Sequence, residues 1–430
     1  NLTNNYLLIK EVEKKLYILA GMNFIDLFAG AGGLSEGFKK AGFIPVAHVE
    51  IDQAACFTLK TRVAYYYLKR TRKKHIYNSY LKGEISREEL YSYIPEKELT
   101  AVINTSIGGK NNKTIFKKID KLKGRKQIDL IVGGPPCQAY SYIGRAALKN
   151  KAKKDERNFL YKEYGKFLTH YQPKVFVFEN VPGIKTAGNG RHFKNLKAYF
   201  KRIGYYLEES SVNAFDFGVV QNRERLIIIG WRKDIEFSYP KFRKLKHSWT
   251  RDDIFSDLLP LKPGQNDRYS TYIKPINEYL TKTGIRNCVD FVSQHITRPH
   301  NKKDLTIYKM AVKKLEEGKL LKNNEIPQKK RTQKNTTDFL DRFKVVGKKP
   351  HAIIAHLSKD GHHFIYPSST NPRSISVREA ARIQSFPDDY YFEGIKTEHV
   401  RTSAFKQIGN AVPPLMAVEI AKAISKKLDE

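Results

Sequence analysis

The sequence predicts an α/β fold: a doubly wound, mostly parallel sheet with a second, smaller and irregular domain. Strand-like and helix-like stretches alternate over about the first 230 residues, as in parallel sheets with crossover helices. A glycine-rich turn at 29–33 separates the first strand from the first helix. From about residue 233 the alternation stops, and an irregular, basic stretch dotted with Pro and Asn continues to about residue 372.

The elements are expected in the following order along the chain. Short apolar runs predict strands, and helical periodicity predicts helices. We expect strands at 24–28, 44–49, 101–104, 129–132, 174–179 and 226–230, strand-like pieces at 352–356 and 362–366, and helices at 34–41, 377–385 and 414–427. The domains predicted from this pattern are a large one at 1–232 plus 391–430, with a Lys- and Tyr-rich insert at about 60–126, and a small one at 233–390.

The charge points to a polyanionic partner. The chain has 430 residues, a net charge of +34 and 40% hydrophobic residues, a composition that excludes general disorder. An anionic membrane surface is the alternative partner, but no apolar run approaches the ~20 residues of a membrane span. The three cysteines are widely spaced and form no disulfide framework and no metal-type pair. We therefore expect a reducing, cytoplasmic setting and no metal.

The glycine-rich turn is a candidate ligand site. Such a turn lets the backbone approach a ligand, and the helix that follows offers free N–H donors. Glu50 lies 20 residues beyond Gly30, at the end of the next strand, where an acidic residue commonly binds ribose hydroxyls. Ser35 stands where a dinucleotide-binding turn has its third glycine. An adenosyl ligand without a pyrophosphate fits better than a nicotinamide dinucleotide, and an ordinary tight turn remains the alternative.

A reactive thiol and charged groups follow three other strands. Cys137 comes directly after Gly-Gly-Pro-Pro at 133–136, a rigid loop that suits a thiol nucleophile better than a packing residue. Cys56 and Cys288 are expected to be buried packing residues. Glu179 ends the strand at 174–179 and is an acid/base candidate. Arg223 and Arg225, which lead into the strand at 226–230, are expected to share one face, so that their guanidinium groups point together.

The order of these motifs resembles the DNA cytosine-5 methyltransferases, in particular bacterial enzymes of the restriction–modification type. The resemblance spans nearly the whole chain and rests on DLFAGAGG (26–33), GPPCQ (134–138), ENV (179–181), QNRER (221–225), SVREAARIQSFPD (376–388) and QIGNAVPP (407–414). It implies an S-adenosylmethionine-dependent methyltransferase fold, with a target-recognition domain in the irregular region. The implied partner is duplex DNA with a specific cytosine-containing site.

The resemblance also implies roles for individual residues. Cys137 would be the nucleophile, Glu179 the residue at cytosine N3, Arg225 a second cytosine contact, and Arg223 its support. The implied residues of the S-adenosylmethionine site are Asp26, Phe28, Ala29, Gly30, Gly32, Gly33, Glu50, Ile51, Ser106, Ile107, Pro136, Asn410 and Ala411. The implied DNA contacts are Gln138, Ser141, Arg145 and Gln221.

Three positions depart from the family pattern. Ile51 replaces an aromatic residue after the ribose-binding acid, Ser106 replaces an Asp near the adenine, and Ala352 stands where a Thr often ends the recognition domain. These departures concern adenine and DNA contacts but not the chemistry. The basic insert is expected to be either a solvated, helix-rich decoration or a contact to the DNA backbone.

The resemblance implies a reaction and leaves alternatives. The thiolate of Cys137 would attack C6 of a flipped-out cytosine, which activates C5 for methylation. We expect a monomer in the bacterial cytosol, paired in function with a restriction endonuclease. An RNA (tRNA) cytosine-5 methyltransferase and a catalytically idle DNA-binding protein on the same scaffold are the alternatives, with a nicotinamide-dependent oxidoreductase a distant further one.

Overall fold

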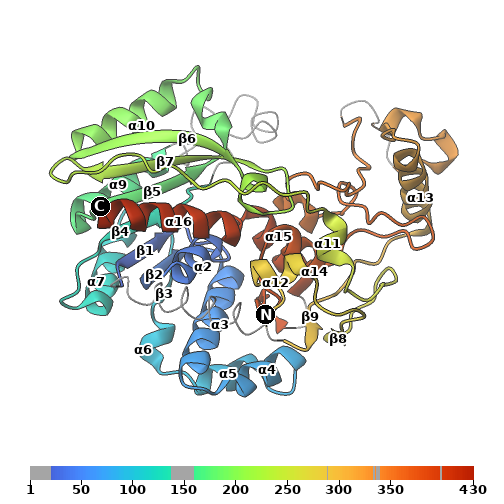
Figure 1. The fold of residues 1–430 in the computed structure, drawn as a ribbon, viewed down its shortest axis with the longest axis horizontal. Helices are drawn as coiled ribbons and strands as arrows, with labels where there is room; N and C mark the ends of the chain where they lie inside the picture. Colours follow the sequence, from blue (N-terminus) through green and yellow to red (C-terminus); the bar gives the residue numbers. More distant parts are fainter. Residues whose placement is uncertain (1–20, 137–158, 288, 333–334, 336–338, 398–399) are drawn as a thin grey trace, which may run out of the picture.

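A seven-stranded sheet lies at the centre of the large region (Figure 1). The computed structural model describes residues 21–136, 159–287, 289–332, 335, 339–397 and 400–430. The strand order is β3-β2-β1-β4-β5-β7-β6. The strands are β1 (Asn23–Leu27), β2 (Ile44–Glu50), β3 (Val102–Asn104), β4 (Leu130–Gly133), β5 (Val175–Asn180), β6 (Tyr205–Asn213) and β7 (Glu224–Arg232).

The predicted mostly parallel, doubly wound sheet is confirmed. The five strands from β3 to β5 pair in parallel, and β7 runs antiparallel to both β5 and β6. The two faces of the sheet are covered by different helices because successive side chains of a strand point to opposite sides. Phe24 of β1 packs with α2 (Gly33–Lys40) and α16 (Pro414–Asp429). Its neighbour Ile25 packs on the other face, with α7 (Asn111–Lys123), α9 (Leu160–Tyr171) and α10 (Arg191–Arg202).

The basic insert is helical and packs against the second region. It contains α3 (Gln53–Arg70), α4 (Lys74–Lys82), α5 (Arg87–Ser92) and α6 (Glu96–Leu99). Several of its tyrosines, among them Tyr65, Tyr77 and Tyr80, are buried in one cluster with Phe291 and Tyr391. These aromatic side chains therefore fasten the insert to the rest of the fold, while Lys69, Lys73 and Lys97 are exposed.

The second region is irregular, as expected, but holds more helix than the sequence indicated. Its elements are α11 (Arg251–Phe255), β8 (Tyr269–Thr271), α12 (Glu278–Thr283), β9 (Phe291–Ser293), α13 (Lys302–Glu316) and α14 (Val377–Ile383), followed by α15 (Val400–Asn410). Figure 1 shows α13 at the outer end of this region. One hydrophobic cluster runs from Ile254 through α14 to α15 and also takes in Ala31 of the glycine-rich turn.

The strand-like pieces at 352–356 and 362–366 were predicted wrongly. The first becomes a 3-10 turn at Ala355–Ser358, and the second contributes only isolated bridges through Ile365. Within the first piece, both backbone polar groups of Ile353 are bound by side chains: its N–H donates to Gln221 Oε1, and its carbonyl accepts from Arg223. Side chains thus replace the partner strand that an apolar run of this kind usually needs. Among the described residues, no helix is long and apolar enough to cross a membrane.

Candidate active site

The glycine-rich turn is held by the end of β2. The backbone N–H of Gly30 donates to Glu50 Oε2 at 2.7 Å, and Glu50 Oε1 accepts from the N–H groups of Ile51 and Asp52 at 2.9 and 2.8 Å. Gly30 has a φ of 54°, in the left-handed region, and a Cβ added there would meet no atom within 4 Å. The turn therefore borders open space beside Glu50, as a ligand pocket requires.

The C-terminal segment closes one side of this turn. A Cβ at Gly33 would overlap the carbonyl oxygen of Val412, so only glycine allows the two backbones to meet. Asn410 and Ala411, two predicted cofactor residues, precede Val412 directly. The structure thus brings them to the glycine-rich turn from almost 400 residues away in the sequence.

Tyr390 supports the turn from the second region. Its hydroxyl donates to the carbonyl oxygen of Ala31, and its ring is fully buried. Sequence reasoning did not single out Tyr390. It lies just beyond the 376–388 motif, and no feature of its surroundings in the sequence predicts a contact 359 residues away.

A buried polar triad lies beneath the turn and accounts for Ser35. Ser35 Oγ donates to Asp26 Oδ2 at 2.5 Å and lies 3.0 Å from His48 Nδ1. Burial raises the pKa of Asp26 to about 7, against the opposing hydrogen bond from Ser35. Burial also lowers the pKa of His48 to about 3. A neutral His48 can then donate to Ser35, which in turn donates to Asp26, so the serine has a polar role that a third glycine could not fill.

The remaining predicted cofactor residues lie at the ends of neighbouring strands. Ile51 is 67% exposed, and Asn104 of β3 donates its side-chain N–H to the carbonyls of Glu50 and Ile51 at 3.2 and 2.9 Å. Ser106, two residues beyond β3, accepts a hydrogen bond from Asn111 at 2.7 Å, and Ile107 packs partly buried on the sheet. The ends of β2 and β3 therefore present a contiguous, partly exposed surface next to the glycine-rich turn.

Glu179 and Arg225 form an ion pair at the end of β5. Arg225 Nε lies 2.7 Å from Glu179 Oε1, and the glutamate is only 9% exposed. A Cβ at Gly134 would lie 2.6 Å from Glu179 Oε2, so the loop after β4 passes directly over this carboxylate. Asn180 also reaches that loop, since its side-chain N–H donates to Pro135 O at 3.4 Å. The loop that leads to the predicted nucleophile thus lies against the predicted acid/base residue.

Several predicted residues lie outside the described part of the chain. These are Cys137, Gln138, Ser141, Arg145 and Cys288. Pro136, which precedes the thiol, is described and exposed. Cys56 is buried, as predicted for a packing cysteine, and burial raises the pKa of its thiol to about 12. Such a thiol is not a nucleophile near neutral pH.

The segment before β7 differs in its contacts from what the sequence suggests. Gln221 is completely buried, where its side-chain N–H donates to the carbonyl of Ile383 and to Gln384 Oε1. Its side chain therefore lies inside the fold, and the DNA contact expected at this position stays a prediction. The two arginines also do not share one set of partners. Arg223 is 1% exposed and donates to the carbonyls of Ile353, Gly409 and Ala411, whereas Arg225 binds Glu179.

The arrangement as a whole fits group transfer at one edge of a sheet. β1, β4 and β5 are adjacent and parallel, so their carboxyl ends meet at that edge, where α/β sheets bind their ligands. The three ends carry the glycine-rich turn, the loop to Cys137, and Glu179. Among the described residues, no group of three or more His, Cys, Asp or Glu side chains could hold a metal ion.

Comparison with known proteins gives the family. The model of the C-5 cytosine-specific DNA methylases matches residues 22–87 and 96–426. The chain is 40% identical to the type II methyltransferase M.Bpa9945I of Bacillus paralicheniformis, over 94% of this chain and 98% of the relative. It is 30% identical to the type II methyltransferase M.DdeI of Desulfomicrobium norvegicum, over 94% of this chain and 88% of the relative.

Solved structures agree on the fold. A prophage-encoded protein of E. coli, described as a candidate DNA modification methyltransferase, superposes with a TM-score of 0.61 at 24% identity and covers 95% of this chain and 100% of its own. The methyltransferase EhMeth of Entamoeba histolytica superposes with a TM-score of 0.54 at 16% identity, over 96% of this chain and 100% of its own. From the family match and the identity to the type II methyltransferases, this chain belongs to the C-5 cytosine-specific DNA methylases.

Proposed function

We propose that this enzyme transfers the methyl group of S-adenosylmethionine to C5 of a flipped-out cytosine in a specific duplex DNA sequence, through a covalent bond between Cys137 Sγ and C6. The family supports DNA cytosine-5 methyl transfer with S-adenosylmethionine as the methyl donor. One observation carries the finer proposal. The loop that precedes Cys137 passes so close to Glu179, the partner of Arg225, that a Cβ at Gly134 would lie 2.6 Å from Oε2, at the strand edge that also carries the glycine-rich turn.

The residues around the turn fit an adenosyl ligand. The backbone at Gly30 faces open space, and the exposed side chain of Ile51 offers an apolar surface for a flat ring. Glu50 accepts three backbone N–H groups and so stays in position at the ribose end of the pocket. When bound, S-adenosylmethionine supplies an electrophilic methyl group on a sulfonium.

The chain's own residues prepare the cytosine to accept that methyl group. The Cys137 thiolate donates its electron pair to C6, and the electrons of the C5–C6 double bond move toward C5. Arg225 holds Glu179 Oε1, which leaves Oε2 on the side of the Cys137 loop, where it can hold a proton at N3. After C5 has gained the methyl group it loses its proton to a base, the C5–C6 double bond forms again, and the Cys137–C6 bond breaks to release the thiolate. The reacting carbons are inaccessible in a stacked duplex, so the base must leave the helix.

A trapping experiment tests the covalent step. Bisulfite sequencing of DNA from cells that express the enzyme identifies the methylated cytosine. A duplex with 5-fluorocytosine at that position should then form an adduct stable to denaturation, because fluorine cannot leave as a proton. The Cys137→Ser variant should bind the duplex but form no adduct and transfer no methyl group. Normal turnover by this variant would exclude the mechanism, and transfer to tRNA in place of duplex DNA would favour the RNA alternative.

The other expectations remain part of the proposal. Residues 233–390 would form the target-recognition domain, and Ser141, Arg145 and Gln138 would contact DNA beside the displaced base. The type II relatives support a partnership with a restriction endonuclease, and a DNA substrate supports a location in the bacterial cytosol. Analytical ultracentrifugation with and without duplex would test the expected monomer.

A further inference from the structure

Five basic residues in two separate segments form a surface that the proposed chemistry does not use. Arg243, Lys244 and Lys246 lie in the coil between β7 and α11, and Lys348 and Lys349 lie about one hundred residues further on. We call these five residues the basic strip. In Figure 1 the coil after β7 turns back along the sheet and leads to α11. All five side chains are exposed.

The turn after β6 fixes both segments at the catalytic edge of the sheet. β6 runs parallel to β5, so its carboxyl end and the turn Ala214–Phe217 lie at the same edge as Glu179. The N–H of Leu245 donates to Asp216 O at 2.8 Å, and His247 Nε2 lies 2.7 Å from Phe215 O. Lys349 Nζ lies 4.5 Å from the centre of the Phe215 ring. The strip therefore sits on this turn although the coil has no regular secondary structure.

The strip is also close to the Glu179–Arg225 pair. The N–H of Asn222 donates to Pro350 O at 2.8 Å, so Lys349 lies beside the start of β7. Asn222 and Arg225 are three residues apart, which spans at most about 11 Å of extended chain. A nucleotide whose base reaches Glu179 must have its own phosphates within a similar distance of that residue. The basic strip is thus placed where the backbone of the target strand has to pass.

The charges of the strip are mostly uncompensated. Lys244 pairs with Asp216 at 2.8 Å. Among the described residues, no carboxylate lies within ion-pair distance of Arg243, Lys246, Lys348 or Lys349. Like charges gathered without counter-charges repel one another, and a polyanion relieves that repulsion.

We propose that the basic strip binds the phosphates on either side of the flipped cytosine and so holds the target strand while the base is out of the helix. This inference rests on the proposed function, since it takes duplex DNA as the substrate. Phosphate contacts position a duplex without reading its sequence. The strip therefore contributes equally to binding of target and non-target DNA, and base selection remains with other residues.

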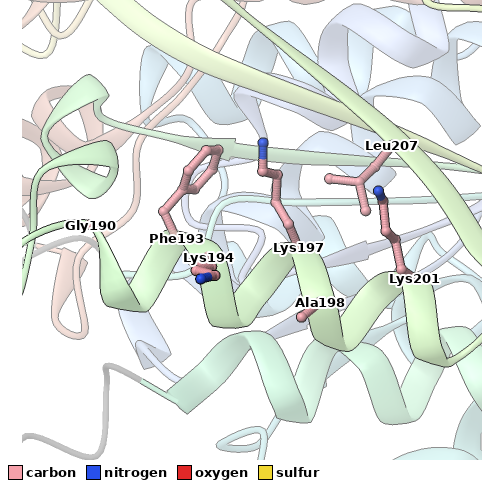
Figure 2. A pocket seen from close by; sticks show the side chains of 7 residues that line it. All are labelled: Gly190, Phe193, Lys194, Lys197, Ala198, Lys201 and Leu207. Atoms are coloured by element: carbon pink, nitrogen blue, oxygen red, sulfur yellow. The ribbon is translucent and has the colours of Figure 1, made fainter.

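Three lysines on a different surface provide a matched control for the basic strip. A hollow of about 370 Å³ between α10 and β6 is lined by Phe193, Leu207 and three lysines, none of which belongs to the predicted site (Figure 2). Two variants then remove three positive charges each from different surfaces. The strip variant carries Arg243→Gln, Lys246→Gln and Lys348→Gln, and the control variant carries Lys194→Gln, Lys197→Gln and Lys201→Gln.

The salt dependence of duplex binding distinguishes the two surfaces. The logarithm of the binding constant falls with the logarithm of salt concentration by about 0.9 per phosphate contact. The strip variant should lower this slope by about 2 to 3 for target and non-target duplexes alike, while its KM for S-adenosylmethionine stays unchanged. The control variant should keep the wild-type slope. Far-UV circular dichroism confirms that both variants fold.

Three results would overturn the inference. An unchanged slope in the strip variant excludes phosphate contacts there, and equal reductions in both variants indicate a general effect of net charge. A loss confined to tRNA binding would equally contradict it. Failure of the proposed function looks different, since the wild-type enzyme itself would then fail to bind or methylate duplex DNA.

Discussion

Replacing Asp26 with asparagine should remove the loss of stability that this buried carboxyl causes as pH rises. Asp26 is completely buried at the end of β1, and burial raises its pKa from 3.8 to about 7. Between these two values the folded chain holds a proton that the unfolded chain has released. Folded-state stability therefore falls as pH rises from about 4 to about 7, and the contribution is lost above pH 7.

The size of this effect follows from the shift in pKa. One pKa unit corresponds to about 1.4 kcal/mol, so the whole shift amounts to about 4 kcal/mol. The part that falls between pH 5 and pH 8 is about 2–3 kcal/mol. Asp26→Asn removes the titrating group. The free energy of unfolding of the variant minus that of the wild type should therefore rise by about 2–3 kcal/mol over this range, whatever its offset at pH 5.

Urea unfolding followed by tryptophan fluorescence at half-unit pH steps measures this difference. Ser35→Ala serves as a second probe, because the Ser35 hydroxyl lowers the pKa of Asp26 and its loss should move the fall in stability to higher pH. A difference between wild type and Asp26→Asn that stays constant within about 0.5 kcal/mol from pH 5 to pH 8 would show that Asp26 ionises normally and refute the reasoning.

Three further substitutions test other parts of the structure. Arg62 forms ion pairs with the buried carboxylates of Glu36 and Asp389. Arg62→Met leaves both carboxylates without this cation and should lower the free energy of unfolding by about 3–5 kcal/mol, measured by urea unfolding. Gly33→Ala forces the Val412 carbonyl away from the glycine-rich turn and should raise the KM for S-adenosylmethionine at unchanged DNA affinity; an unchanged KM contradicts the close approach. Arg225→Met removes the partner of Glu179 and should lower kcat about 100-fold or more while duplex binding persists, as a methyl-transfer assay beside an anisotropy titration would show.

The parts of the fold that the sequence predicts well are the buried parallel strands. The runs at 24–28, 129–132 and 174–179 match β1, β4 and β5 to within one residue at each end, because strands covered on both faces are apolar throughout. β6 escaped prediction for the opposite reason. Tyr205–Asn213 is an edge strand with buried and exposed positions that roughly alternate, and its Glu and Ser residues read as a loop.

In the candidate site too, the local sequence predicts some features, whereas others depend on contacts between distant parts of the chain. The strand ends alone place Glu50, Glu179 and the loop to Cys137 at one edge, since parallel strands share a direction. The roles of Gln221 and Arg223 depend on partners 130 to 188 residues away. From the sequence alone, a polar residue in a short motif is interpreted as a surface contact, because the backbone groups that it hydrogen-bonds are not known. Burial of these side chains is thus a tertiary property that the motif itself does not contain.

The same long-range contacts join the glycine-rich turn rigidly to the second region. Tyr390 holds Ala31 of the glycine-rich turn, and Arg223 holds the backbone of Gly409 and Ala411. Tyr390, Ala31 and Arg223 are each only 1% exposed. Separation of the two regions would therefore break these hydrogen bonds and leave their polar groups without a protein partner. A hinge motion between the sheet and the α14 segment would have to break this network. The glycine-rich turn and α14 should therefore unfold in a single transition.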